Sequence, residues 1–279
     1  MALEINGEPV IPTLRRRLIE CNCEKHGKFE TTWFIDNEGK PIGEPICPEC
    51  KKEEDEQYRI IASKMYAEAL VTSALTDAGV PSDNFDSSFD SYIATTDEMK
   101  NKLDVCKKFV IKDNIYPSCL CFLGLCGTGK THLAVSCIRA IIVDNLRSKK
   151  QEDKIKYTRA SELMRDFKSI MNTKKGGTTE NQLIREYQTY YFLVIDELGR
   201  YIQGDYSTSL IREIISYRIE SNRKTILIMN GDFAELKSIV GEHIISRLSE
   251  KGKSLIFKEP DYRKKMQMER KNEESTNAV

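Results

Sequence analysis

One stretch of the chain, residues 119–134, limits the possible folds more than any other. An apolar run, Leu120–Leu123, leads into Gly124–Thr131, whose sequence G-L-C-G-T-G-K-T matches G-x-x-x-x-G-K-[ST] in full. Apolar residues then recur at helical spacing from Thr131 to Val143. A buried strand, a glycine-rich loop and a helix in this order predict a phosphate-binding loop.

The composition of this loop explains how it would bind ATP. Glycines let several backbone N–H groups point into one concavity, and the N-terminus of the following helix adds partial positive charge there. Lys130 is expected to reach the β- and γ-phosphates, and the Thr131 hydroxyl to hold Mg²⁺. The predicted nucleotide-binding residues of the segment are Gly124, Cys126, Gly127, Thr128, Gly129, Lys130, Thr131 and His132.

A second apolar run, Tyr190–Ile195, predicts a buried strand that ends in two carboxylates, Asp196 and Glu197. After a phosphate-binding loop, this pattern is typical of a strand that serves the same nucleotide. Asp196 is predicted to bind Mg²⁺, and Glu197 to orient and activate an attacking water. The alternative interpretation is that the two acidic residues only end a strand.

Cysteine and histidine residues near the N-terminus form two knuckles with metal-ligand spacing. Cys23-x-x-His26 and Cys47-x-x-Cys50 each place two ligands on one tight turn, and two such turns close a tetrahedral Zn²⁺ site. Cys21 is an alternative ligand in place of Cys23 or His26, and unmetallated thiols are the competing interpretation. Four protein ligands leave no open coordination position, so the predicted zinc is structural.

The segment between the knuckles predicts a β-hairpin. Phe29–Ile35 is rich in β-formers, and Asp36–Gly39 supplies a turn before the second arm. A module of this size is too small to bury a core, so a bound metal would supply its stability. We therefore expect a zinc-ribbon-like domain.

Charge and cysteine usage narrow the possible functions. The 279 residues include 43 basic and 43 acidic side chains, so any nucleic-acid contact must be a local patch. Lys174 and Lys175, in the loop Asn172–Thr179, are candidates to contact single-stranded nucleic acid, although a solvated surface loop fits equally well. No apolar run reaches membrane-spanning length, and cysteines scattered in apolar segments are typical of reduced thiols in a cytoplasmic protein.

Periodicity and turn residues predict the remaining elements. The expected helices are Lys51–Leu75, Thr95–Lys112, Ala160–Met171 with Ser161 as its cap, Thr208–Ser221, Phe233–Val240 and Glu242–Glu250. The expected strands are Ile155–Thr158, Thr225–Met229 and Ser254–Lys258. Loops are expected at Asp83–Tyr92, near the nucleotide base, and at Leu198–Ser207, with an unstructured tail from Met266.

The motifs in their order resemble those of a known family. The glycine loop is followed by F-L-V-I-D-E-L-G, T-I-L-I-M-N, G-E-H-I-I-S-R-L and P-D-Y-R. Over Phe85–Lys265 the chain resembles the DnaC/IstB group of AAA+ ATPases, and the zinc knuckles make it most similar to DnaC-type replicative helicase loaders of bacteria or phages. The resemblance implies a three-layer α/β P-loop AAA+ domain with a central parallel sheet and a small helical bundle after it, preceded by a small zinc-ribbon-like N-terminal domain with a helix. The expected domains are residues 1–80 (zinc-binding and helicase-docking), 81–265 (AAA+ ATPase) and 266–279 (disordered tail).

The resemblance also implies roles for residues outside the two main motifs. Asn230 matches sensor 1, which hydrogen-bonds the γ-phosphate or the attacking water. Arg247, in S-R-L, matches the arginine finger offered to a neighbouring subunit, and Arg263, in D-Y-R, matches the sensor 2 arginine. The group often has an arginine at the position of His243, which is the competing location for the finger.

The resemblance further implies partners and a reaction. A DnaB-type helicase would be held by the N-terminal domain, and ATP would drive assembly of a ring or helical array on single-stranded DNA. ATP hydrolysis would then release the loader from the helicase. Two alternatives stay open: an IstB-like transposition helper that acts on duplex DNA, and an adaptor that binds nucleotide without hydrolysing it.

Overall fold

A computed structural model describes residues 4–5, 8–9, 15–36, 38–111, 117–148, 154–172, 179–202 and 204–262. The chain divides into two compact units, Met1–Ala69 and Leu70–Val279. The predicted domain boundaries after residues 80 and 265 stay predictions. The lysine loop at Lys174 and Lys175, Arg263 and the tail from Met266 lie outside the described residues.

The first unit is built on a long β-hairpin. Strands β3 (Arg15–Cys23) and β4 (Gly27–Ile35) pair antiparallel along their whole length, after the short strands β1 (Glu4–Ile5) and β2 (Glu8–Pro9). The strand at Phe29–Ile35 was predicted correctly, but its predicted partner was wrong.

The true partner lies upstream because the first knuckle is itself the hairpin turn. Gly27 adopts φ +77°, in the left-handed region that a tight turn between Cys23 and β4 requires. Downstream of the Asp36–Gly39 turn, only an isolated bridge joins Ile35 to Pro41. Pro41 and Pro45 lack backbone donors, so this segment is a poor second arm.

The helix α1 (Pro48–Asp77) contributes residues to both units. Its last turns bury Val71 and Leu75 in the core of the second unit. Gly79 then takes φ +83°, and Pro81 follows, so the helix ends where its sequence predicts. No helix in the described part of the chain combines the length and the apolar character that a membrane crossing requires.

The second unit contains a five-stranded, entirely parallel sheet in the order β6-β7-β8-β5-β9. The strands are β5 (Cys119–Gly124), β6 (Ile155–Arg159), β7 (Phe192–Asp196), β8 (Lys224–Met229) and β9 (Gly252–Phe257). The predicted central parallel sheet is confirmed. Because all strands run in the same direction, the residues that follow β5, β7 and β8 meet at one edge.

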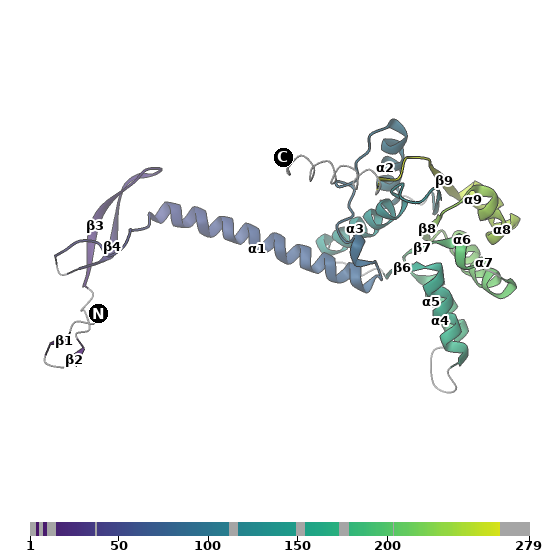
Figure 1. Ribbon diagram of the computed structural model, residues 1–279, viewed down its shortest axis with the longest axis horizontal. Helices are drawn as coiled ribbons and strands as arrows, with labels where there is room; N and C mark the ends of the chain where they lie inside the picture. The colour runs from purple at the N-terminus through teal and green to yellow at the C-terminus, as the bar shows by residue number, and fades with distance from the viewer. Residues whose placement is uncertain are drawn as a thin grey trace, which may run out of the picture. The chain divides into compact units, whose positions relative to one another are not determined.

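Helices cover both faces of this sheet (Figure 1). Leu120 and Phe122 of β5 pack toward α2 (Asp97–Phe109), α3 (Lys130–Ser148) and the end of α1, whereas Cys119, Cys121 and Leu123 pack toward the opposite helices. The opposite layer consists of α4 (Ala160–Asn172), α5 (Glu180–Thr189), α6 (Leu198–Tyr201), α7 (Asp205–Glu220), α8 (Phe233–Val240) and α9 (Glu242–Lys251). Burial on both faces explains why the strands read as continuous apolar runs.

Four local predictions need correction. α4 begins at Ala160, so Ser161 lies inside its first turn and is not its cap. The segment Leu198–Ser207 is not a loop throughout, because it contains α6 and the start of α7. The helix α5 was not predicted. In the described part of the chain no helical bundle follows the sheet, since α8 and α9 precede β9 and pack against α7.

Candidate functional site

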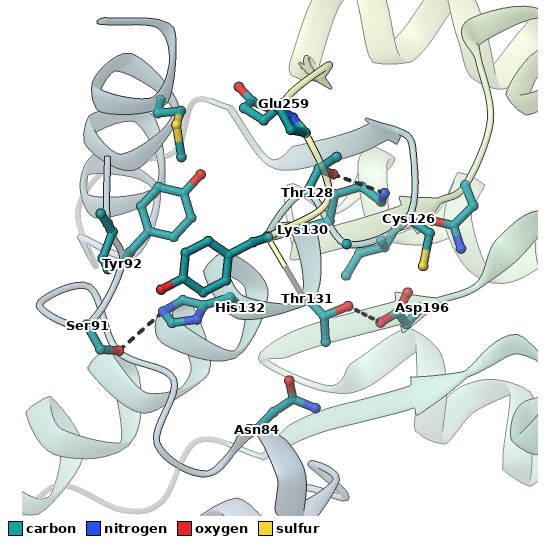
Figure 2. A pocket seen from close by; sticks show the side chains of 18 of the residues that line it. Asn84, Ser91, Tyr92, Cys126, Thr128, Lys130, Thr131, His132, Asp196 and Glu259 are labelled. Atoms are coloured by element: carbon teal, nitrogen blue, oxygen red, sulfur yellow. Dashed lines mark hydrogen bonds between the residues drawn. The ribbon is translucent and has the colours of Figure 1, made fainter. Parts of the chain in front are cut away.

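A cavity of about 570 Å³ lies at the carboxyl edge of the parallel sheet (Figure 2). It brings together most of the residues predicted to bind or hydrolyse ATP, from three strand ends. These are Cys126, Gly127, Thr128, Gly129, Lys130, Thr131, His132, Asp196, Glu197 and Asn230. Gly124, the remaining predicted residue of the loop, ends β5.

Two glycines of the loop pack closely against other parts of the chain. Gly124 has φ +133°, and a Cβ atom there would lie 2.0 Å from the Phe257 carbonyl oxygen of β9. Gly129 has φ +89°, and a Cβ there would lie 3.0 Å from the Tyr92 ring. Any larger side chain at Gly124 would therefore push β5 away from β9 and deform the loop.

The Lys130 ammonium is held inside the loop. It donates to the Gly124 carbonyl oxygen at 2.9 Å and also to the Leu125 carbonyl oxygen, with the Thr128 hydroxyl 3.5 Å away. Burial lowers the pKa of Lys130, because the cation is partly removed from water. A phosphate bound at the loop would meet a preorganised cation together with the N-terminus of α3.

Three donors converge on the Asp196 carboxylate. Oδ2 accepts from the Thr131 hydroxyl at 2.9 Å and from the Tyr157 hydroxyl at 2.7 Å, while Oδ1 accepts from the Glu197 backbone N–H at 2.7 Å. Figure 2 shows Thr131 pointing toward Asp196. A carboxylate beside a threonine hydroxyl at a phosphate loop is the oxygen donor set that suits Mg²⁺, so these residues fit the predicted ion.

Tyr157 was missed by sequence reasoning. It lies on β6, whose register places it opposite Val194 of the neighbouring strand. Its pKa is raised, first by burial and then by the adjacent Asp196, so the hydroxyl keeps its proton and acts as a donor. The only sequence signal was an aromatic residue in a short strand, which does not indicate what the hydroxyl contacts.

Glu197 has a conformation that is uncommon for a residue with a side chain. Its φ of +59° lies in the left-handed region, immediately after β7. Its Oε1 lies 4.0 Å from Arg159 Nε, and both side chains are about four-tenths exposed. Glu197 and Asn230 both line the same cavity, so their predicted roles toward an attacking water concern one site.

The segment Asp83–Tyr92, before α2, supplies another wall of the cavity through Asn84, Ser91 and Tyr92, and its proximity to a nucleotide base stays a prediction. His132 Nε2 lies 3.0 Å from the Ser88 carbonyl oxygen and 3.3 Å from the Ser91 hydroxyl. Burial lowers the pKa of His132, and the opposing effect of the Ser88 hydrogen bond is smaller. The lowered pKa favours a neutral ring that donates to the Ser88 carbonyl oxygen. Tyr92, the last residue of that predicted loop, also lines the cavity, as do Met99 and Glu259, which were not predicted.

The arginine predicted to act in a neighbouring subunit lies elsewhere. Arg247, on α9, pairs with Glu220 Oε1 at 2.6 Å, and the cavity lining in the described residues does not include it. α9 leads into the amino end of β9, so Arg247 lies toward the edge of the sheet opposite the glycine loop. His243, the competing position, is exposed on the same helix.

The first unit brings four predicted metal ligands together. One ligand atom from each of Cys23, His26, Cys47 and Cys50 lies within 4.8 Å of all the others, and Cys21 is not part of this group. Individual separations from His26 Nδ1 to the sulfurs run from 3.3 to 3.8 Å, and the Cys23 and Cys50 sulfurs are 3.5 Å apart. A tetrahedral zinc site with these ligands has edges of about 3.6 to 3.8 Å, so the group fits the predicted ion.

The electrostatics of the thiols favour a bound cation. The pKa of Cys23 is lowered to about 6, chiefly by the backbone N–H of His26, whereas that of Cys50 is raised to about 11, chiefly by its contact with Cys23. A second thiolate is therefore disfavoured unless a metal balances the charge. His26 Nε2 faces Glu53 Oε1 at 3.4 Å, which fixes the ring with Nδ1 toward the sulfurs.

Two features define a P-loop protein of the AAA+ type. One is the strand order of the parallel sheet, and the other is the phosphate loop that lies beside Asp196 and Glu197 at the end of β7. A family model supports this conclusion. Described as "IstB-like ATP binding protein", it matches residues 89–270. The chain belongs to this family of ATP-binding proteins.

Individual relatives and a solved structure agree with the family. The chain is 31% identical over 181 residues to the replicative helicase loader DnaC of Buchnera aphidicola subsp. Baizongia pistaciae, covering 64% of this chain and 70% of the relative. It is 28% identical, with the same coverage, to the replicative helicase loader DnaC of Escherichia coli strain K12. The crystal structure of the DnaC helicase loader superposes with a TM-score of 0.53 at 25% identity, covering 64% of this chain and all of that chain.

Proposed function

We propose that this protein is an ATP-dependent loader that places a DnaB-type replicative helicase on single-stranded DNA. The observation that carries the proposal is similarity to replicative helicase loaders across 70% of their length. The family model, at residues 89–270, covers most of the residues that line the cavity. The helicase and the DNA are inferred from the relatives' names, whereas the chemistry is inferred from the site.

The proposed reaction is hydrolysis of the γ-phosphate of ATP. The loop N–H groups and Lys130 hold the phosphates, while Thr131 and Asp196 would hold Mg²⁺, which offsets the negative charge of the phosphate oxygens. Glu197 orients the attacking water and accepts its proton, and Asn230 hydrogen-bonds the γ-phosphate or that water. All five side chains line one cavity.

Two further arginines complete the proposed machinery. Arg247 would reach the γ-phosphate of a neighbouring subunit, where arginine fingers contribute about 10³ to 10⁵ in rate in GTPase systems. Arg247 is not among the described residues that line its own chain's cavity, which agrees with a role in trans, provided that its pair with Glu220 opens. Arg263 would contact the nucleotide as sensor 2, and it follows Tyr262, whose backbone N–H donates to the Gly127 carbonyl oxygen at 2.9 Å.

The zinc-binding unit is the proposed docking site for the helicase. Four ligands without an open position support a structural Zn²⁺, and not a catalytic one. In this scheme residues 1–80 bind the helicase and residues 81–265 form the ATP switch. The γ-phosphate is present in only one nucleotide state, so its contacts can favour ring or helical self-assembly on single-stranded DNA before hydrolysis and release after it.

Size-exclusion chromatography with light scattering tests this function. The full-length protein is mixed with a DnaB-type helicase, with ATP or with ADP, alongside the variants Glu197→Gln and Cys47→Ser/Cys50→Ser. We expect co-elution for the wild type, a complex that persists in ATP for Glu197→Gln, and loss of co-elution for the zinc variant. Absence of a complex in every nucleotide state would contradict the proposal.

A transposition helper is the alternative, and the name of the matching family model favours it. Such a protein would bind duplex DNA and would have no affinity for a helicase. Fluorescence anisotropy with single-stranded and duplex oligonucleotides separates the two functions. ATPase activity stimulated by duplex DNA alone would move the assignment to this alternative, while an unaffected Glu197→Gln variant would indicate an adaptor that does not hydrolyse ATP.

A further inference from the structure

Two buried polar atoms at the cavity are left without hydrogen bonds. Tyr92 is only 8% exposed and lines the cavity, as does Glu259. Within the residues that the structure describes, neither the Tyr92 hydroxyl nor Glu259 Oε2 has a hydrogen-bond partner. Burying such atoms unpaired is unfavourable, and ligands commonly supply the missing partners.

Glu259 is held as an acceptor. Its other oxygen, Oε1, pairs with the ammonium group of Lys102 on α2, and that ammonium also lies 4.8 Å from the centre of the Phe257 ring. Lys102 is itself buried, so this ion pair fixes the position of the carboxylate. Oε2 therefore remains free to accept a hydrogen bond from a molecule in the cavity.

Tyr92 is held as a donor. Its ring lies 5.5 Å from the His132 ring, centre to centre, and packs against Gly129 of the phosphate loop. Burial first, and then the nearby Glu259 charge, raise the pKa of Tyr92, so its hydroxyl keeps its proton. Figure 2 shows Tyr92 and Glu259 on two of the segments that surround the cavity.

We propose that Tyr92 and Glu259 read the base of the bound nucleotide and select adenine. The 6-amino group of adenine donates to Glu259 Oε2, and a neighbouring ring nitrogen, N1 or N7, accepts from the Tyr92 hydroxyl. Hypoxanthine and guanine carry a carbonyl oxygen at position 6. This oxygen and the Glu259 carboxylate are both acceptors, so no hydrogen bond would form between them. The inference rests on the proposed nucleotide site and adds the two residues that select its base.

Base analogues test this proposal in binding experiments that need no hydrolysis. Titration calorimetry on the full-length protein compares ADP with IDP, 7-deaza-ADP and 1-deaza-ADP. We expect IDP to bind at least about 10-fold more weakly than ADP, because a site built to hydrogen-bond a group rejects analogues that lack it. One of the two deaza analogues should bind about fivefold more weakly than ADP, and the analogue that does so identifies the ring nitrogen that Tyr92 contacts.

Two variants assign the effects to the residues. Tyr92→Phe removes only the hydroxyl, so ADP should bind about fivefold more weakly and the sensitive deaza analogue should now match ADP. Melting of the ligand-free variant should be unchanged or higher, because the hydroxyl had no partner to lose. Tyr217→Phe, at an exposed tyrosine of α7, is the matched control and should change neither the affinity for ADP nor the melting temperature.

Glu259→Gln should remove most of the preference for ADP over IDP. Since this change leaves buried Lys102 without its anion, Lys102→Met/Glu259→Gln serves as the second variant if the first fails to fold. Equal binding of ADP and IDP by the wild type, or an unaltered preference in both Tyr92→Phe and the Glu259 variants, would overturn base selection. If the wild type binds none of the diphosphates, the nucleotide site itself is overturned, and the two failures are thus distinguishable.

Discussion

At the scale of single residues, the position of Asp196 depends on a neighbour that the motifs do not contain. Tyr157 donates to the same oxygen, Oδ2, that accepts from Thr131. A carboxylate with these fixed donors has little freedom to rotate. Tyr157 is therefore a positioning residue, which acts on the predicted Mg²⁺ site through Asp196.

In Tyr157→Phe, nucleotide binding should need a higher concentration of Mg²⁺, while the protein stays folded. Loss of one buried hydrogen bond, worth about 1 kcal/mol, should raise the half-saturating Mg²⁺ concentration about fivefold. The measurement is binding of a fluorescent ATP analogue during a Mg²⁺ titration, with binding in EDTA as the reference. If the variant's affinity for the nucleotide falls as much in EDTA as it does with Mg²⁺ present, the result would contradict a role at Asp196.

Lys224 provides a prediction for pH. Burial lowers its pKa to about 8, while the cation lies 4.6 Å from the Phe109 ring centre and donates to the Pro117 carbonyl oxygen at 3.3 Å. Between pH 8 and the unfolded value near 10.5, the unfolded chain binds more protons at this site than the folded chain. This site therefore makes the folded state more stable as pH rises through that window, and the cost of burying the charge is fully present below pH 8.

Lys224→Met removes this titration. We expect the variant to be more stable than the wild type at pH 7.5, by about 1 to 3 kcal/mol, and the difference to shrink toward pH 10. Urea unfolding of both proteins at the two pH values measures the change, because other titrating groups cancel in the comparison. A stability difference that does not vary with pH would show that Lys224 keeps its ordinary pKa.

At the scale of secondary-structure elements, one buried arginine joins α5 to the sheet. Arg218 of α7 is fully buried, and it donates to the carbonyl oxygens of Tyr187, Gln188 and Tyr190 at the end of α5. It also donates to the Lys224 carbonyl oxygen and the Thr225 hydroxyl at the start of β8. A cation at a helix C-terminus is favourable because the unpaired carbonyl groups carry partial negative charge.

Arg218→Met should destabilise the second unit by about 3 kcal/mol or more, since several buried carbonyl groups would lose their donor. The same change should raise amide hydrogen exchange in α5 more than in α3, which lies on the other face of the sheet. Leu210→Ala, a core truncation on the same helix, is a matched control that weakens packing without freeing those carbonyl groups. Equal exchange in both helices would argue against a local role for Arg218.

The elements that sequence reasoning placed correctly are those with a strong local pattern. The apolar run before Gly124 and the run before Asp196 could belong only to buried strands, and their motifs fixed where each ends. The helix α5 was missed although Thr179 and Gln182 form a capping box at its start and Leu183, Ile184 and Tyr187 form its buried face, because a helix of ten residues gives only a short stretch of apolar periodicity. The partner of β4 was misassigned because pairing of strands is a non-local choice that alternation alone does not encode.

At the scale of the whole molecule, the two compact units are stabilised by different means. The second unit buries apolar clusters on both faces of its sheet. In the described part of the first unit few side chains are buried, Ile35 and Cys47 among them. We therefore expect a metal bound by the four clustered ligands to stabilise this unit in place of an apolar core. Stability that comes from a metal is lost when the metal is removed, and stability from an apolar core is not.

Chelation should therefore unfold the first unit selectively. With a strong zinc chelator, we expect β3 and β4 to lose protection against hydrogen exchange while ADP binding at the second unit stays within about twofold. Cys47→Ser/Cys50→Ser should behave like the chelated wild type, and Cys21→Ser should behave like the untreated protein, because Cys21 is outside the ligand group. Loss of ADP binding on chelation would show that the units do not fold independently.

The strand order has a consequence for how the chain is synthesised. β5, which carries the phosphate loop, is flanked by β8 and β9, the last two strands of the chain that the structure describes. A ribosome therefore completes Lys130 and Thr131 long before either neighbour of β5 has emerged, and Gly124 can pack against Phe257 only after β9 has been synthesised. A nascent chain released before β9 would expose the apolar edge of β5 as a template for aggregation. We therefore expect the phosphate loop to reach its final conformation only on chains that extend through β9, so products truncated before β9 should not bind ATP or compete with the longer protein.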